Sequence, residues 1–206
     1  MSTYKLIIKM TGYWFAGTGS EAGAYADSIA LKDENGLPYF PGKSLKGIFR
    51  NAFKIAENNN WFTDHKDLEN FLFGKEGSYC RPGESGKNQT FIEPNNLLTS
   101  GHLHFSNAVI DPRITEFVLK EPDLRKLLFK TIQNTAINSN GVADATSLRS
   151  YEVVVPLRLM SEISFDETDN LSGEKMLEML RQVSALIMDI GGKRRRGFGR
   201  CIMEVS

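Results

Sequence analysis

The sequence is poor in the residues that staple small proteins together or anchor them in membranes. It has two cysteines and three histidines among 206 residues, so neither a disulfide framework nor a structural metal site is expected. No apolar run reaches the length of about 18 residues that a membrane span needs. Residues 1–10 lack the apolar stretch and small-residue cleavage site of a signal peptide. We therefore expect a cytoplasmic protein without membrane contact, and its length suits one domain with its own core.

The sequence also has no net charge. The 25 basic and 25 acidic residues cancel, which by itself argues against nucleic acid as a partner, because phosphate-binding proteins usually carry a basic excess. The distribution is uneven, however. Residues 193–196 form a Lys-Arg-Arg-Arg run, whereas acidic residues gather in the 162–178 stretch. A local phosphate-binding site is therefore compatible with a neutral total.

The periodicity of apolar residues predicts a mixture of strands and helices. Strands are expected at residues 4–15, 101–110, 151–165 and 200–205. Helices are expected at residues 45–56, 61–73, 121–131 and 177–190. Ser44 and Ser172 are the expected N-caps of the first and last helix. The order strand, helix, strand, long excursion, strand, helix, strand predicts an α+β, ferredoxin-like fold in which two helices back an antiparallel sheet.

Two polar segments interrupt this order. Residues of about 74–96 are dense in Gly, Ser and Glu, as is typical of a mobile surface loop. Residues 134–150, within an insertion of about 130–150, are too long for a simple connector. Such a segment is usually functional or disordered, and the pattern leaves both open.

The start of the first helix is a candidate phosphate-binding site. Free backbone N–H groups near Gly42 to Ser44 favour an anion, and Lys43, Lys46 and Arg50 add positive charge over about two turns. The same residues would also suit an ordinary solvated helix start, and the pattern alone does not decide.

The glycine-rich segment of residues 191–199 is the second candidate. Lys193, Arg194, Arg195 and Arg196 stand between two pairs of glycines, which permit close approach of a backbone to phosphates. A solvated basic turn is the alternative. Four adjacent cations favour a site that binds phosphates without reading base sequence. Phe198 is expected to open the last strand rather than to stack on a base.

Three segments, taken in order, resemble the RAMP superfamily of CRISPR proteins. Residues 37–50 (LPYFPGKSLKGIFR) resemble the family's entry into its first helix, and residues 191–199 (GGKRRRGFG) resemble its glycine-rich loop before the last strand. The run from Leu148 through Tyr151-Glu152 to Pro156 resembles the return of a "thumb" insertion to the sheet. The resemblance spans most of the chain and implies a single RAMP domain over residues 1–206, with an RRM-like sheet and a thumb.

Residues 26–33 (ADSIALKD) are most similar to the backbone subunits of type III CRISPR effector complexes. The resemblance implies a subunit that binds guide CRISPR RNA, stacks with copies of itself and other effector subunits, and meets target RNA. It further implies that Asp27 cleaves the target with Mg²⁺ or Mn²⁺. A lone loop aspartate is otherwise a turn or cap residue, which is what we expect of Asp33 and its neighbour Glu34 beside Asn35-Gly36.

The resemblance also implies that the thumb pushes between bases of the guide–target duplex. Ile137 and Arg149 are the residues expected to act there. The acidic–basic pair that backbone subunits often carry near the thumb is replaced here by residues 134–138 (NTAIN), so contacts through arginine are in doubt.

Three other functions compete with this hypothesis. A non-catalytic structural or capping RAMP subunit would bind guide RNA and tolerate loss of Asp27. A RAMP enzyme that processes precursor guide RNA would need a general-base histidine, and His65 is the one near the first helix. An unrelated single-strand RNA-binding module would need exposed aromatic residues on central strands. His102 and His104 share an expected strand face, but coincidence is favoured over a metal site even when Cys80 is counted.

Overall fold

The computed structural model describes residues 1–17, 28–65, 67–74, 100–137, 139, 141–142, 147–169 and 171–206. Asp27, Cys80 and the expected mobile loop beyond Gly74 lie outside these residues. No described helix is long and apolar enough to cross a membrane.

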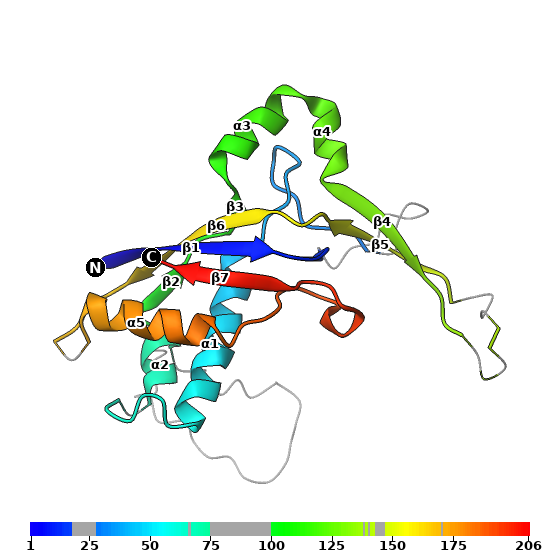
Figure 1. Cartoon of the computed structure of the whole chain (residues 1–206). Coiled ribbons are helices and arrows are strands. Elements are labelled where there is room, and N and C mark those ends of the chain that lie inside the picture. Colours follow the sequence, from blue (N-terminus) through cyan, green and yellow to red (C-terminus); the bar gives the residue numbers. More distant parts are fainter. Residues whose placement is uncertain are drawn as a thin grey trace, which may run out of the picture.

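The centre of the molecule is an antiparallel sheet of order β2-β6-β1-β7 (Figure 1). Its strands are β1 (Ser2–Met10), β2 (Leu103–Phe105), β6 (Arg158–Phe165) and β7 (Cys201–Val205), and the short β3 (Val109–Ile110) also pairs with β6. Leu6 lies opposite Ser161 of β6 and Val205 of β7. The mixed helix and antiparallel-sheet architecture is confirmed, and the strand order is compatible with a ferredoxin-like fold.

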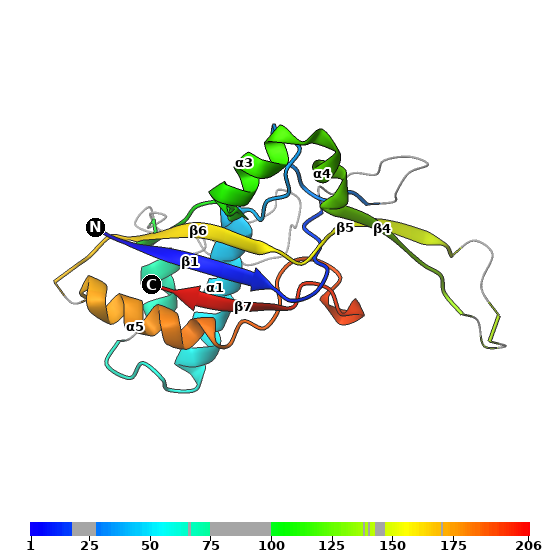
Figure 2. The same cartoon turned by 45° about the horizontal axis from the view of Figure 1, so that its top comes forward.

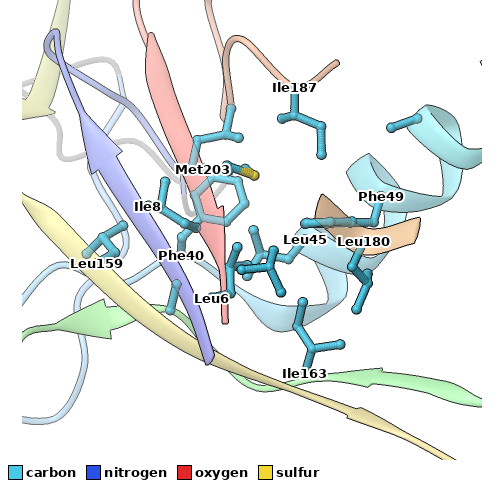
Figure 3. Close-up of a cluster of buried hydrophobic side chains, with 14 of the residues drawn as sticks. Leu6, Ile8, Phe40, Leu45, Phe49, Leu159, Ile163, Leu180, Ile187 and Met203 are labelled. Atoms are coloured by element: carbon cyan, nitrogen blue, oxygen red, sulfur yellow. The ribbon is translucent and has the colours of Figure 1, made fainter. Parts of the chain in front are cut away.

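Three helices cover one face of this sheet: α1 (Gly42–Asn58), α2 (Leu68–Phe73) and α5 (Gly173–Ser184) (Figures 1 and 2). Alternate residues of β1 are buried beneath them because side chains of a strand point to opposite faces. Leu6 and Ile8 gather with Leu45 and Phe49 of α1 and Leu180 of α5 (Figure 3). Burial of such side chains stabilises the fold by about 1.5–3 kcal/mol each.

The helix ends confirm one predicted cap and correct the other. Ser172 caps α5, since its side chain accepts a hydrogen bond from the Lys175 amide. Ser44 does not cap α1: Pro41 is the N-cap, and its carbonyl accepts from the amides of Ser44 and Leu45. Proline suits this place because its fixed φ and extended ψ lead directly into the first turn.

Several predicted elements are shorter or divided. The first strand ends at Met10, the expected strand 101–110 is split into β2 and β3, and the second helix covers only residues 68–73. Two short helices, α3 (Pro112–Lys120) and α4 (Pro122–Leu127), lie on the other side of the sheet from α1 and α5 (Figure 1). Asp33 accepts hydrogen bonds from the Asn35 and Leu37 amides, which confirms it as a turn former.

A hairpin projects from the sheet where the long excursion was expected (Figures 1 and 2). It consists of β4 (Phe129–Asn134) and β5 (Arg149–Val154), with Ile132 opposite Tyr151. The sequence pattern indicated a helix to residue 131, irregular chain to residue 150 and a strand from residue 151. Strand β4 was therefore not predicted, and β5 begins two residues before the expected strand. We call this hairpin, with the residues between its strands, the thumb.

Candidate nucleic-acid interface

A groove of about 280 Å³ lies between the start of α1 and the glycine-rich segment of residues 191–199, which we call the glycine-basic loop. Its walls include Pro41, Ser44 and Ile48 on one side and Gly191, Gly192 and Arg194 on the other. Two of the segments singled out in the sequence, distant along the chain, thus face one another. Of the predicted RNA-binding residues, Ser44 and Arg194 line this groove.

The glycine-basic loop takes its shape from close contacts that only glycine permits. Gly191 and Gly199 have φ of +90° and +86°, a region that other residues rarely adopt. A Cβ at Gly199 would lie 1.9 Å from the Ile190 oxygen, and one at Gly191 would lie 2.4 Å from the Phe15 oxygen. The Gly192 amide donates to Phe15 O at 2.7 Å. The loop is therefore packed closely against Phe15, in the segment that follows β1.

The four cations of the loop have different surroundings, although the sequence presented them as one run. The ammonium of Lys193 lies 4.5 Å from the centre of the Tyr151 ring, and Arg196 donates to the Tyr151 hydroxyl at 3.0 Å. Arg194 pairs with Asp189 at 3.2 Å at a half-exposed position. Arg195 is exposed and makes no side-chain hydrogen bond or ion pair with the described part of the chain. All four residues are exposed to solvent, and Arg194 and Arg195 are the two that Tyr151 does not contact.

The basic residues of α1 do not form a single surface with the groove. Lys46 is two residues from Ser44, about 200° around the helix, and so lies on another flank. Arg50 is turned to α2, where its Nε donates to Glu69 at 2.6 Å. Burial lowers the pKa of Lys46, and the nearby charge of Arg50 lowers it further. Lys43 is exposed at the first turn.

The start of α1 is partly satisfied by the protein itself. The Gly42 amide donates to the side-chain oxygen of Asn107 at 2.9 Å, so one of the N–H groups that could bind an anion already has a partner. Sequence reasoning missed Asn107, because 65 residues separate it from Gly42 and no local pattern marks it.

The thumb presents apolar side chains beyond its paired strands. Ile137, a predicted thumb residue, is 70% exposed, and Val142 and Leu148 are exposed as well. Arg149 begins β5 opposite Asn134. Three exposed aliphatic side chains near one end of a hairpin could contact the faces of bases, and Val142 was not recognised in the sequence.

A buried carboxylate ties the thumb to the segment that follows Asp27. Glu152 of β5 is only 3% exposed, and its side chain accepts from the Lys32 ammonium at 2.9 Å and the Ala30 amide at 3.2 Å. The Glu152 amide in turn donates to Ser28 O at 3.0 Å. Asp27 itself lies outside the described residues, but the chain is anchored to β5 from the very next residue.

Two competing hypotheses find little support. His65 lies beyond the C-terminal end of α1 and lines a pocket with Lys175 and Glu178 of α5, whereas the groove is at the other end of this helix of 17 residues, about 25 Å away. On the sheet face away from α1, the exposed positions of β1, β6 and β7 carry no aromatic side chain; they include Lys5, Lys9, Arg158, Glu162, Ile202 and Glu204. A base-stacking platform on the central strands is therefore absent from this face.

His102 directly precedes β2 and His104 lies within it, and the two histidines have separate partners. The His102 ring stacks on Phe71 with centroids 4.3 Å apart, and His104 Nε2 lies 3.3 Å from Asp166. Within the described ranges, no group of three or more His, Cys, Asp or Glu side chains is arranged to hold a metal ion.

Comparison with known proteins gives one family match and a shared fold. The sequence model of the RAMP superfamily matches residues 7–202. A chain from the cryo-EM structure of type III-B Cmr-beta bound to cognate target RNA superposes with a TM-score of 0.67 at 10% identity, covering 100% of this chain and 97% of that one. A chain from type III-B Cmr-beta in the apo state gives 0.64 at 12% identity, with 98% and 96% covered. No curated protein sequence matches.

Proposed function

Because the chain belongs to the RAMP superfamily, we propose that it is a guide-RNA-binding backbone subunit of a type III CRISPR antiviral ribonucleoprotein. The observation that carries this proposal is the groove between α1 and the glycine-basic loop, which brings Ser44 and Arg194 to one place. The fold is shared with chains of type III-B Cmr-beta, one of them from the structure of Cmr-beta bound to cognate target RNA, and this supports the choice of complex. Its partners would be guide RNA, target RNA, other effector subunits and copies of itself.

The guide backbone would run along this groove. Ser44 lines one side and Arg194 the other, and the exposed Lys43 and Arg195 are their neighbours in the chain. Phosphates would thus meet cations and a hydroxyl without any reading of bases. Lys46 and Arg50, on another flank of α1, would contribute positive potential rather than direct contacts. Such binding suits a protein that must accept guides of any sequence.

The thumb would act on the guide–target duplex. Ile137, with Val142 and Leu148, exposes aliphatic surface that can insert between bases, and Arg149 at the start of β5 can meet the backbone beside them. Insertion of apolar side chains unstacks neighbouring bases locally. Distortion at each subunit would expose one phosphodiester per thumb.

The same subunit would cleave target RNA, with Asp27 as the catalytic residue. In such a reaction the 2′-hydroxyl attacks the adjacent phosphorus and the bond to the 5′-oxygen breaks, so the carboxylate has to orient the nucleophile or hold a divalent cation. Mg²⁺ or Mn²⁺ would neutralise charge that develops on the phosphate. The anchoring of Ser28, Ala30 and Lys32 to β5 supports a cleaving loop held beside the thumb.

The test uses the chain assembled with its partner subunits and a guide, incubated with labelled complementary RNA and Mg²⁺ or Mn²⁺. Asp27→Ala is expected to abolish cleavage while target binding persists. Glu34→Ala is the matched control, because Glu34 is an exposed carboxylate in the neighbouring turn, and it should cleave at regular intervals like wild type. Guide and target binding without cleavage by any of the three proteins would leave the non-catalytic structural subunit as the function.

A further inference from the structure

Tyr151 occupies an unusual position between the thumb and the glycine-basic loop. It belongs to β5, is only 4% exposed, and packs with Phe15 and Val153 in a hydrophobic cluster separate from the main core. Its ring meets Phe15 edge-on at 6.5 Å between centroids. The Tyr151 ring thus lies between its own strand and Phe15, the residue whose carbonyl accepts from the amide of Gly192 in the loop.

Two of the four cations of the loop, Lys193 and Arg196, contact the Tyr151 side chain. Lys193 Nζ lies 4.5 Å from the ring centre, the Arg196 guanidinium carbon lies 5.5 Å from it, and Arg196 donates to the hydroxyl at 3.0 Å. A cation over an aromatic face is attracted by the ring's negative potential. Tyr151 therefore restricts the rotamers of both side chains before any RNA arrives.

The backbone conformation of the glycine-basic loop also indicates that the loop is conformationally constrained. Lys193 has φ of +60°, one of three described non-glycine residues with positive φ, and it precedes the 3₁₀ turn Arg194–Arg196. Such a conformation persists only where the surroundings enforce it. Hydrogen bonds to Phe15 and Tyr13 and the contacts with Tyr151 supply that enforcement.

We infer that Tyr151 is a positioning residue that preorganises Lys193 and Arg196 for the guide backbone and couples guide binding to the thumb. The inference rests on the proposed function, since it takes the glycine-basic loop to bind guide RNA. Long cationic side chains lose rotamer freedom on binding, so cations that are already ordered bind more tightly. Because Tyr151 is part of β5, whatever stabilises the loop also stabilises the hairpin, and the coupling is reciprocal.

A double-mutant cycle tests the positioning role. Affinity for labelled single-stranded guide RNA is measured for the full chain with Tyr151→Phe, Arg196→Gln and both changes. Tyr151→Phe keeps the ring and its packing but removes the acceptor for Arg196. It should weaken binding about 3- to 10-fold, which is the size of effect that loss of a typical intramolecular hydrogen bond has. The double variant should bind no more weakly than Arg196→Gln alone, because the hydroxyl acts through that arginine.

Hydrogen exchange tests the coupling independently. Guide RNA should slow amide exchange in β4 and β5 of the wild type, and in Tyr151→Leu the slowing should be confined to residues 191–199. A merely structural tyrosine would raise exchange of the hairpin with and without RNA but leave the RNA-induced difference intact, and that result would overturn the inference.

The outcomes separate the inference from the function on which it rests. Equal guide affinity of wild type and Tyr151→Phe, with thermal unfolding also equal, contradicts the positioning role alone. A wild-type chain that binds no guide RNA contradicts the proposed function and the inference together.

Discussion

The described residues form two hydrophobic clusters, which differ in size and in the parts of the molecule that they support. The main core joins β1, β6 and β7 to α1 and α5, and it includes Leu6, Phe49 and Leu180. The smaller cluster consists of Phe15, Tyr151 and Val153, with Tyr13, Ile132 and Phe198 at its edge. The first holds the sheet and helices together; the second supports only the junction of the glycine-basic loop with the thumb. Global stability and the proposed RNA contacts therefore depend on different residues.

The largest effect on stability should come from the main core. Phe49 is fully buried and packs against Phe105 with ring centroids 5.0 Å apart. Phe49→Ala removes the whole buried ring and leaves a cavity, so the free energy of unfolding should fall by about 3–5 kcal/mol. Urea unfolding monitored by circular dichroism measures this change in the free energy of unfolding. A loss below about 1 kcal/mol would show that the region around α1 can collapse to fill the space.

Two glycine substitutions in the glycine-basic loop test whether its close packing matters for guide affinity. Gly199→Ala places a Cβ 1.9 Å from the Ile190 oxygen at φ of +86°, so the loop must shift and guide affinity should fall at least about 10-fold. Gly197 has φ of +81° but nothing within 4 Å of its Cβ position. Gly197→Ala therefore introduces left-handed strain but no close contact, so guide affinity should fall less than in Gly199→Ala. Equal loss of affinity in both variants would contradict a role for close packing.

Features of the fold could be predicted from the sequence where the interacting residues are close together along the chain. The apolar stripe of α1, the cap Ser172 and the turn at Asp33 follow from neighbours within a few residues, and the structure confirms them. The hairpin strand β4 was not predicted because its half-buried and exposed residues do not alternate strictly. Its pairing with β5 decides its conformation, and that pairing is not visible in local periodicity.

The candidate site was predicted in outline and not in detail for the same reason. The glycine-basic loop and the start of α1 were recognised by composition. Their surroundings depend on long-range contacts: Arg50 with Glu69, Gly42 with Asn107, and Glu152 with Lys32, separated by 19, 65 and 120 residues. A run of four cations therefore gave no sign that two of them would be held by Tyr151.

The smallest effect concerns the thiol at the edge of the main core. Burial, and to a smaller extent the charge of Asp189, raise the pKa of Cys201 to about 12. The thiol stays protonated at pH 8, so alkylation by iodoacetamide in the folded protein should be slow and should accelerate on unfolding. Rapid native-state alkylation, followed by mass spectrometry of the peptide with Cys201, would show that β7 opens easily and that the two clusters differ less than the structure indicates.

The central claim is that cations of the glycine-basic loop bind the phosphates of the guide, and the salt dependence of guide binding tests it most directly. The variant Arg194→Gln/Arg195→Gln is compared with the charge-matched Lys120→Gln/Lys126→Gln, whose lysines pair locally with Glu116 and Asp123 on α3 and α4. Each lost phosphate contact on a single strand reduces the slope of log K against log salt by about 0.7. The account predicts a reduction of about 1.4 for the loop variant and no change for the control. Equal slopes for wild type and the loop variant would contradict it.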